Sequence, residues 1–502
     1  MAQTQKQSSF WVKYSREAVL LLSNSRYLFW IVLFTYVTLA FFNFGWIGMD
    51  EYYHNIKLFI PAESNSLENL LQHSDIRSPV QVLPFWILSQ LLAWLGISDP
   101  WWQFRAVLLC WAAISAGTLY AAFSVFQSSL NRFDLKNTYL TKSHSLLIFY
   151  GLLPFIATRP MFESLALPLV ALFLSHLQKA YFEKKLINIY YALFFLCLSC
   201  LFRPQIGLGI LALSFVIWKV IPFKHWPWIG LYSLLLLFLS GVPDWILLGE
   251  WHQALKGYLS FNLVEHNPSK GESMFGVSPW YTYLPTFLAA SWIPFFLFLK
   301  KETLKKSFLL TLPCWIFTLS FLIFHSVIPH KEERFLIPIL GGVLFTIYPL
   351  WDYIVDNSGK YKYRFMGIVC LNLFVLFLSF PAMPQKNSLS LIRHLEKSPE
   401  IAAVTKRRKT QILIPSALLS RDFKIRKLTD KKLENLNHEN CRGHYVFRYD
   451  DLVKGRVPNG LKKIAEFSPS VVDAWVVALN PKRNARRGSL SLYQCPEIQR
   501  SQ

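Results

Sequence analysis

The sequence of 502 residues has little that would hold a metal ion. Its seven cysteines show no metal-ligand spacing, and it contains no Asp-x-Asp motif or other compact cluster of carboxylates. Five cysteines lie in apolar segments, where cysteine is most often a packing residue: Cys110, Cys197, Cys200, Cys314 and Cys370. Cys441 and Cys495 lie in a polar tail and can pair if that tail is in an oxidising compartment. We therefore expect a protein that uses neither a metal nor a cofactor.

The sequence also lacks two marks of a secreted eukaryotic glycoprotein. It has no Asn-x-Ser/Thr acceptor site with x other than Pro. Residues 1–26 are basic but contain no short apolar stretch with a small-residue cleavage site, so residues 27–46 are expected to be a retained first membrane span. Residues 1–26 would then stay in the cytoplasm. No eukaryotic retention signal is present either, and we expect a bacterial inner membrane, with the endoplasmic reticulum as the alternative.

Long apolar runs dominate what is present. Hydrophobic residues make up 53% of the chain and the mean hydropathy is +0.30, although the formal net charge is +22. A soluble protein would not expose repeated apolar runs of about 20 residues, so we predict an all-α polytopic membrane protein. The apolar segments cover residues 27–46, 79–97, 104–127, 143–158, 164–182, 187–203, 205–222, 228–249, 281–299, 307–329, 335–356 and 363–382. Because their interiors hold almost no charged residues, a pore or a carrier is disfavoured.

The basic residues indicate how these segments cross the membrane. Short loops rich in Lys and Arg stay in the cytoplasm, and five connections have this composition: residues 132–142, 179–185, 219–224, 300–306 and 360–364. If all twelve segments crossed the membrane, some of these basic connections would lie on the non-cytoplasmic side. All five fall inside if residues 79–97, which Pro79 and Pro84 interrupt, dip into the membrane or lie at its surface. We predict about 11 transmembrane helices plus this re-entrant or interfacial segment, with the C-terminus outside.

After residue 382 the composition changes. Residues 385–502 contain 24 Lys and Arg against 11 Asp and Glu, a net charge of +13, and no further apolar run of membrane length. Short β-like runs occur at residues 411–414, 444–448, 474–478 and 490–493, with helix candidates at 388–404 and 461–467. We predict a small α/β domain outside the membrane. Its charge fits a solvated surface, or attraction to anionic lipid head groups or a lipid-linked phosphate. The expected domains are thus 1–26, 27–382 and 385–502.

One stretch between two apolar segments, Ile328–Pro338, is unusually rich in charge. It contains His330, Lys331, Glu332, Glu333 and Arg334. Ionisable groups at a membrane boundary are costly unless they are paired, hydrated or functional, and an ordinary charged turn is the alternative. The order His-Lys-Glu-x-Arg-Phe resembles the signature of glycosyltransferase family 22, the Alg9-like mannosyltransferases, which belong to the GT-C superfamily.

Other segments match the pattern of this family in the correct order, over about residues 45–345. Asp50 and Glu51 follow the first span, as an acidic pair does in the family, although Gly48-Met49 replaces the His-Pro that often precedes it. Arg159-Pro-Met-Phe-Glu163 and Arg203-Pro204 resemble polar positions beside middle spans. The segments Tyr258–Asn262 and 274–283 are similar to elements of the long outer loop of the family.

The resemblance implies a reaction that breaks the bond between C1 of a sugar and a lipid phosphate. Asp50 is the expected general base, and Glu51 is the second candidate. Positive groups are needed to bind the phosphate as its charge grows; the candidates are His330, Lys331, Arg334, Arg159, Arg203 and Arg77. Groups expected to orient these or to contact the sugar or acceptor are Glu163, Glu332, Glu333, Asn262, Trp280, Tyr281 and Tyr283. The aromatic residues of this set can instead be interfacial anchors.

The family therefore predicts a metal-independent, inverting membrane glycosyltransferase. The donor would be a polyprenyl- or dolichyl-phosphate hexose, mannose by the family's name, and the acceptor a glycan, glycolipid or protein on the non-cytoplasmic face. We expect membrane lipids but no nucleic acid as partners. Two other interpretations remain open: a transporter or flippase for a lipid-linked glycan, in which the same residues bind a head group only, and a non-catalytic assembly subunit.

Overall fold

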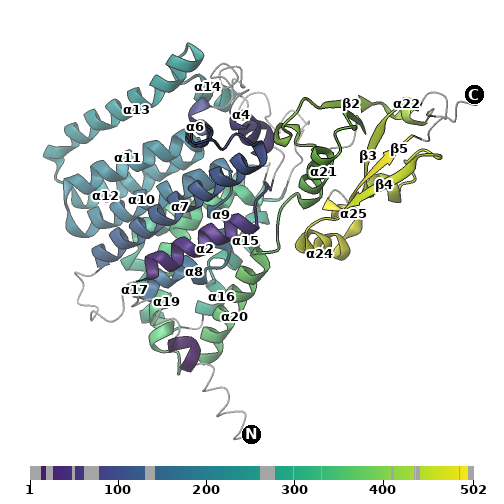
Figure 1. Cartoon of the computed structure of the whole chain (residues 1–502). Coiled ribbons are helices and arrows are strands. Elements are labelled where there is room, and N and C mark those ends of the chain that lie inside the picture. The colour runs from purple at the N-terminus through teal and green to yellow at the C-terminus, as the bar shows by residue number, and fades with distance from the viewer. Residues whose placement is uncertain are drawn as a thin grey trace, which may run out of the picture. The chain divides into compact units, whose positions relative to one another are not determined.

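The structure is a computed structural model of the chain (Figure 1). It describes residues 13–17, 27–47, 51–60, 78–130, 142–260, 278–297, 299–328, 331–408, 412–434, 436, 441–484 and 487–495. The chain divides into two compact units, and each is described by itself. The helical unit consists of Met1–Thr38, Leu67–Pro84 and Leu109–Leu376, and the mixed unit consists of Leu39–Ser66, Phe85–Leu108 and Phe377–Gln502.

Each of the twelve apolar segments contains helix in the structure, as the hydropathy predicts. The longer helices are α2 (Leu28–Phe42), α6 (Leu83–Trp94), α7 (Pro100–Leu130), α10 (Phe162–Glu183), α11 (Leu186–Phe202), α12 (Gly209–Val220), α13 (Trp226–Leu248), α17 (Lys301–Leu310), α18 (Leu312–Val327), α19 (Leu340–Asp356) and α20 (Lys362–Ser379). Shorter ones are α4 (Lys57–Phe59), α8 (Leu146–Phe149), α9 (Leu152–Ala157), α14 (Gln253–Leu259), α15 (Tyr283–Ala290) and α16 (Ile293–Phe296).

The expected count of eleven membrane spans is not confirmed. Among the described residues, five helices are long and apolar enough to cross a membrane, or up to six if the bent pair α17 and α18 counts as one span. Four apolar helices are shorter: α2, α6, α11 and Pro204–Val220. With 12 residues, α6 falls below the about 20 that a span needs. Its re-entrant or interfacial placement stays a prediction.

Breaks within the apolar segments explain part of this difference. Residues 307–329, for example, form two helices that meet at an angle of 86°. Pro313 lies in the first turn of α18 and has no backbone N–H to continue the hydrogen bonds of α17, so a new helix begins at this point. Likewise, the segment 143–158 is divided into α8 and α9, and the segment 281–299 into α15 and α16. Hydropathy measures apolar length but does not locate such breaks.

Helix α10 lies at the centre of the helical unit. It packs against α9, α11, α12, α18, α19 and the 3-10 helix η9 (Glu333–Ile339). Gly341 and Gly342 allow α19 to approach its neighbours closely, since a Cβ on Gly341 would lie 3.3 Å from the backbone nitrogen of Ala171 in α10, and one on Gly342 would clash with Thr318 in α18. Because η9 directly precedes α19, this close packing holds the charged stretch beside α10.

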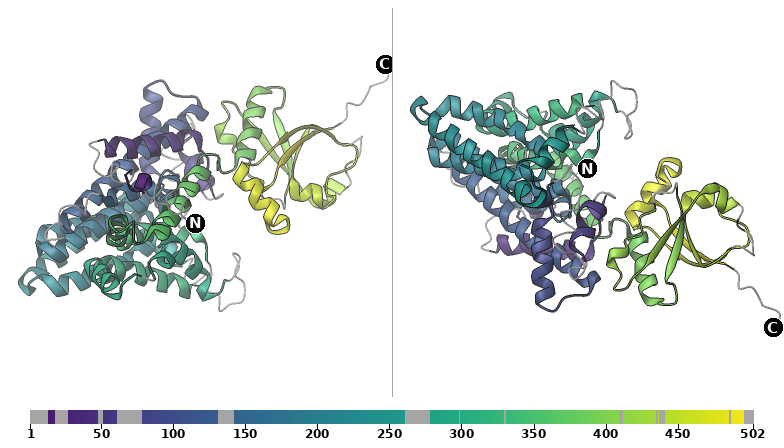
Figure 2. Two further views of the ribbon diagram at one scale, coloured as in Figure 1. Left: turned by 90° about the horizontal axis from the view of Figure 1, so that it is seen from below. Right: turned by 90° about the horizontal axis from the view of Figure 1, so that it is seen from above.

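The last part of the mixed unit is a domain with one five-stranded sheet, shown from other sides in Figure 2. We call residues 386–495 the sheet domain. Its strands are β1 (Ala403–Arg407), β2 (Lys424–Leu428), β3 (His444–Arg448), β4 (Lys462–Phe467) and β5 (Leu490–Gln494), in the order β2-β1-β3-β5-β4. The first three strands are parallel, and β5 is antiparallel to both β3 and β4. Helix α21 (Lys386–Lys397) packs against β4 and β5. The domain also contains α22 (Asp430–Glu434), α23 (Tyr449–Val453), α24 (Val471–Leu479) and α25 (Pro481–Asn484).

The α/β character of this domain agrees with the sequence, but several of its elements were predicted wrongly. Residues 444–448 and 490–493 are strands as predicted. The predicted helix 388–404 is only partly confirmed, because α21 ends at Lys397 and residues 403–404 belong to strand β1. Residues 461–467 form strand β4 instead of a helix, because they pair with β5 along the edge of the sheet. Residues 474–478 form helix α24 instead of a strand, and the described residues 412–415 carry no strand.

Cys441 and Cys495 form a disulfide, as the polar tail allows in an oxidising compartment. Both lie in the apolar cluster on one side of the sheet, together with Tyr445, Phe447 and Tyr493. The bond closes a chain segment with a sequence separation of 54 residues. Closing a loop of this length restricts the unfolded chain and stabilises the folded domain.

Candidate active site

A buried ion pair joins two helices of the helical unit. Arg203 follows the last residue of α11, where the backbone turns extended in front of Pro204. Glu163 lies in the first turn of α10, where the helix dipole favours a carboxylate. Nη2 of Arg203 contacts Oε1 of Glu163, and their side chains are 13% and 2% exposed. Two predicted site residues 40 positions apart thus meet in one pair.

The Arg203 guanidinium keeps donors that this pair does not use. Its Nε atom is buried and has no hydrogen-bond partner among the described residues. One face of the group lies over the ring of Phe162, at 5.7 Å from the centroid. His325, near the end of α18, is buried and lies within electrostatic reach of Arg203. A buried donor without a partner is costly and is usually retained for a ligand, a water or an ion.

Arg159 lies in the turn between α9 and α10, and only 1% of its surface is exposed. Its Nε donates to the carbonyl oxygen of Phe155 at 3.3 Å, and its guanidinium lies 4.2 Å from the centroid of the Phe155 ring. A buried arginine between apolar helices is expensive unless its charge is paired, hydrated or used by a ligand. Arg159 lies four residues before Glu163, which is in the first turn of α10.

The charged stretch is held by its neighbours through its backbone. The hydroxyl of the buried Tyr283 donates to the carbonyl oxygen of Glu332 at 3.1 Å and accepts from the Glu332 N–H at 3.0 Å. Nζ of Lys331 donates to the carbonyl oxygens of Ile328 at 2.5 Å and Ser278 at 3.2 Å. Arg334 forms an ion pair with Glu332. Burial lowers the pKa of Lys331. The turn is therefore an ordered structure with its cations fixed in place.

The packing brings this turn into the same part of the helical unit as the ion pair. Residues 333–339 form η9, which contacts α10, and α18 contacts the 3-10 helix η4 (Pro204–Leu208) that follows Arg203. Glu163, Arg203 and the 331–334 turn come from three separate segments of the chain. Together they form a region of the helical unit that combines cationic and acidic side chains.

A fourth segment lies against the end of α11. Nε2 of Gln81 donates to the carbonyl oxygens of Leu201 and Phe202, at 3.1 Å each, directly before Arg203. Oγ of Ser78 donates to Oδ1 of Asp244 at 2.6 Å, and the second oxygen of this buried carboxylate accepts from the N–H of Ala254 at 3.0 Å. These contacts fix the chain that follows Arg77 between α11 and α13.

In the mixed unit, the loop after α2 is held tightly. Both carboxylate oxygens of Glu51 accept the N–H of Ile47, at 3.0 and 3.1 Å, and only 4% of Glu51 is exposed. The hydroxyl of Tyr52 accepts the N–H of Ala417 at 3.0 Å. Burial raises the pKa of Tyr52 to about 12. Glu51 thus holds the N–H of Ile47, and Tyr52 binds Ala417 of the sheet domain.

Not every predicted site residue can be placed. Asp50, Arg77, Asn262 and His330 lie outside the described residues. Trp280 and Tyr281 are 69% and 54% exposed, as suits either a sugar contact or an interfacial anchor. Glu333 is exposed at the start of η9. Tyr283 is buried, so its ring presents no open face to a sugar in this structure, and its hydroxyl holds the turn instead.

The sequence reasoning did not identify His325, Gln81 or Tyr52. The histidine is the one polar ring in the apolar run Leu319–Val327, directly before the charged stretch, and that position was a usable signal. Gln81 and Tyr52 carry no comparable signal, because their partners are backbone groups far away in the sequence. Within the part of the chain that the structure describes, no three His, Cys, Asp or Glu side chains are grouped as metal ligands.

Comparison with known proteins decides the family. The sequence pattern of the Alg9-like mannosyltransferase family matches residues 27–421. The chain belongs to this family. The resemblance drawn from the His-Lys-Glu-x-Arg-Phe motif is thereby confirmed. As a member of the family, the chain is a multi-pass membrane glycosyltransferase. A search of curated proteins found no match.

Solved structures support the same fold. ArnT from Cupriavidus metallidurans, a GT-C glycosyltransferase, is similar both in the crystal structure bound to undecaprenyl phosphate and in the apo state. Each comparison has a TM-score of 0.57 at 10% sequence identity and covers 93% of this chain, with 97% and 98% of the respective ArnT chains. At this identity the likeness concerns the fold: this family member has a GT-C architecture.

Proposed function

We propose that the protein transfers a hexose, mannose by the family to which it belongs, from a polyprenyl- or dolichyl-phosphate carrier to a glycan or glycolipid acceptor. The observation that carries the proposal is the buried Glu163–Arg203 pair beside the 331–334 turn in a member of this family. The similar ArnT protein was crystallised with undecaprenyl phosphate bound, which supports a donor of this class.

In the proposed reaction, the acceptor hydroxyl attacks C1 of the sugar while the bond from C1 to the phosphate oxygen breaks. Asp50 takes the proton of the attacking hydroxyl, and the lipid phosphate leaves with the bonding electron pair. One displacement from the face opposite the phosphate inverts the configuration at C1. Only one carboxylate is needed as a base, and the two backbone hydrogen bonds to Glu51 support a structural part for that residue.

The phosphate gains negative charge as the bond breaks, so fixed cations beside it stabilise the transition state. We assign this task to Arg203, whose Nε is available, with Arg159, Lys331 and His330 as further donors. Arginine presents its donors in a planar fork that matches phosphate oxygens, whereas lysine acts as a point charge. Glu163 would orient Arg203 and keep its charge balanced when no donor is bound. Arg334, Glu333 and Arg77 would contribute to the same end of the donor, and Asn262, Trp280 and Tyr281 to the sugar or acceptor.

We assign the reaction to the non-cytoplasmic face. The disulfide of the sheet domain supports this assignment, since disulfides persist in oxidising compartments and are rare in the cytoplasm. The sheet domain and the loop after α2 also belong to the same unit and are joined through Tyr52, so they should face the same side. The proposed membrane is the bacterial inner membrane.

The test uses purified protein with a series of polyprenyl-phosphate sugars, offered one at a time. Transfer should occur with the mannose donor, and Asp50→Asn should abolish it while the protein stays monodisperse with unchanged circular dichroism. Glu51→Gln serves as the neighbouring comparison and should disturb the loop fold along with activity. Unchanged turnover of Asp50→Asn would remove Asp50 from the mechanism. Translocation of a lipid-linked glycan without any sugar transfer in proteoliposomes would instead identify a transporter.

A further inference from the structure

Helix α24 of the sheet domain is apolar on its exposed side. Its sequence is VVDAWVVAL, and none of its residues is fully buried. Val471, Trp475 and Leu479 are 49%, 53% and 86% exposed, and Ala474 and Ala478 are exposed as well. Positions i, i+3, i+4, i+7 and i+8 lie on one face of a helix. One complete face of α24 is therefore apolar and in contact with solvent.

The one charged residue of α24 is kept away from this face. Asp473 is 18% exposed and forms an ion pair with Arg487 at 3.4 Å, and its backbone N–H donates to Oγ of Ser470 at 3.1 Å. This contact fixes the start of the helix at Ser470. The helix is thus well defined at its N-terminus and orders an apolar surface that the domain does not use for its own core.

Among the described residues, α24 contributes no side chain to the apolar cluster around Phe447 and Tyr493. Helix α21 packs against β4 and β5. The main neighbour of α24 is the short helix α25. Figures 1 and 2 show α24, in yellow, at the periphery of the domain. An exposed apolar face of this kind marks a contact with a partner.

Basic residues follow the apolar helix directly. Lys482, Arg483, Arg486 and Arg487 occur within eight residues after Leu479, in a domain whose net charge is +13. Tryptophan prefers the boundary between lipid and water, and Lys and Arg beside it attract anionic head groups. We propose that α24 lies in the head-group region of the membrane that the chain itself spans, with Trp475 and Leu479 inserted and the basic run bound to anionic phospholipids.

The dimensions of α24 favour this partner over a protein. Nine residues of helix are about 13 Å long, far too short to cross a bilayer but sufficient for an interfacial contact. One face of such a helix offers a few hundred Å² at most, whereas a specific protein interface takes about 800 Å² from each partner. A lipid surface needs no such minimum area, because the membrane anchors the chain nearby and the local concentration is high.

The experiment measures the depth of a nitroxide label on the full-length protein in nanodiscs that hold one copy. The label is attached to Ala474→Cys or Ala478→Cys after replacement of the five free cysteines, and the 441–495 disulfide is kept. Its collisions with oxygen and with a water-soluble nickel complex give the depth. We expect both positions at about 5–10 Å into the boundary between head groups and acyl chains, and deeper with phosphatidylglycerol present than with phosphatidylcholine alone.

The matched control is Asn459→Cys, which labels an exposed polar turn of the same domain. It should remain fully accessible to the nickel complex in both lipids. Trp475→Ser combined with Leu479→Ser changes only exposed side chains and should return the Ala474 label to the control value. A label at 474 that behaves like the one at 459 overturns the proposal, and so does a label shielded from both reagents, which would indicate a protein contact. Equal depth with and without phosphatidylglycerol would overturn the preference for anionic lipid.

Discussion

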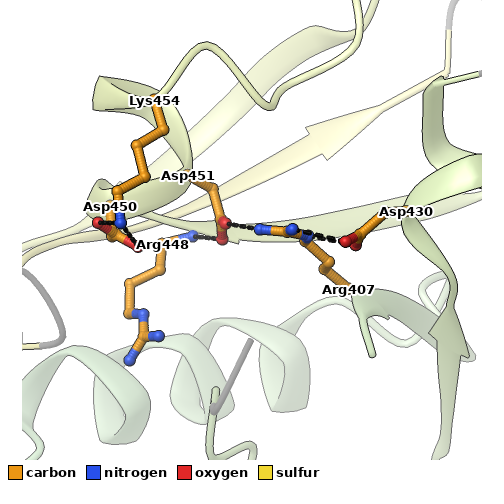
Figure 3. Close-up of polar contacts among 6 residues, drawn as sticks. All are labelled: Arg407, Asp430, Arg448, Asp450, Asp451 and Lys454. Carbon is orange, nitrogen blue, oxygen red and sulfur yellow. Dashed lines mark hydrogen bonds and ion pairs between the residues drawn. The ribbon is translucent and has the colours of Figure 1, made fainter. Parts of the chain in front are cut away.

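Arg203 of the helical unit and Arg407 of the sheet domain are both largely buried and both pair with carboxylates, but they use their guanidinium groups differently. Figure 3 shows Arg407 between Asp430 and Asp451. Its Nε and Nη2 donate to the two oxygens of Asp430 at 2.5 and 2.8 Å, and its Nη1 donates to Asp451 at 3.1 Å. Arg203 makes one contact with Glu163, and its buried Nε has no partner among the described residues.

The difference separates a structural arginine from one that is available to a ligand. Asp430 and Asp451 raise the pKa of Arg407 above its ordinary value, and Asp451 also accepts the backbone N–H of Arg448 at 3.4 Å. All three of its nitrogens are engaged, and the network joins the end of β1 to the starts of α22 and α23. Burial of an arginine is therefore not by itself evidence for a site; unused donors beside other cations are the better indicator.

The largest effect is expected at Arg407. Arg407→Ala leaves the carboxylate of Asp451, which is 1% exposed, without its cation and should lower the free energy of unfolding of the sheet domain by about 3–5 kcal/mol. Hydrogen exchange at the amides of β1 and β3 measures this loss. Lys454→Ala removes an exposed ion pair with Asp450 and should change the stability by less than about 1 kcal/mol. If Arg407→Ala stopped sugar transfer without lowering the stability of the domain, Arg407 would not be a purely structural residue and its contrast with Arg203 would fail.

Arg203 should behave in the opposite way. Arg203→Lys keeps the positive charge beside Glu163 but loses the planar donors, so we expect transfer to slow by about 10²–10³-fold, the usual cost of removing one donor to a developing oxyanion. Unfolding should change little. Arg426→Lys, at an exposed position of β2, is the control and should remain active. In the proposal, Glu163 acts through Arg203. Adding Glu163→Gln to Arg203→Lys should therefore reduce the transfer rate little further. If the two losses of transfer rate added up instead, Glu163 would have a separate role.

The disulfide tests whether the sheet domain lies in an oxidising compartment and whether its stability is separate from that of the Arg203 region. Replacing both Cys441 and Cys495 by Ser should destabilise the domain by about 2–4 kcal/mol, measured by the same hydrogen exchange at β3. The Arg203 region lies in the other unit and should keep its exchange rates. A thiol reagent should leave both cysteines unmodified in protein isolated without reductant. Free thiols at these positions would contradict the non-cytoplasmic placement.

A smaller, pH-dependent effect is expected at His444 in β3. Burial lowers its pKa from the ordinary 6.5, with a weaker opposite influence of Glu400. The unfolded chain therefore binds a proton more readily than the folded domain, and stability falls as the pH drops below about 6.5. His444→Gln should remove this dependence in unfolding experiments between neutral and acidic pH. A sheet domain that becomes more stable on acidification would contradict the assignment.

The sequence predicted some levels of this structure well and others poorly. Every predicted apolar segment contains helix, because backbone that crosses a membrane must satisfy its own hydrogen bonds. No apolar segment marked α14 or the helices of the sheet domain. The breaks within the apolar segments were missed, since the bend before Pro313 depends on local backbone geometry. In the sheet domain, valine-rich residues 474–478 resembled a strand, but the capping pattern Ser470-x-x-Asp473 begins a helix there. That signal was present in the sequence and outweighs β-propensity.

For the candidate site, the family motif named residues that the structure brings together, such as Glu163 and Arg203. It could not reveal that the Tyr283 hydroxyl binds the backbone of Glu332, or that Gln81 binds the carbonyl groups before Arg203. Backbone acceptors carry no sequence signature, so partners of this kind become visible only in three dimensions. The pairing of charged side chains was predictable from residue type, but the hydrogen bonds that hold the surrounding backbone in place were not.

The composition of the mixed unit has a consequence for the order of assembly during synthesis. The loop after α2 is made early, yet its unit also needs Phe377–Gln502, which is made much later. Tyr52 must wait for Ala417 before their hydrogen bond can form. The chain at Tyr52 would therefore reach its final surroundings only after Ala417 has been made. A nascent or truncated chain should remain inactive in the membrane, which would protect the carrier lipid pool from unproductive reactions.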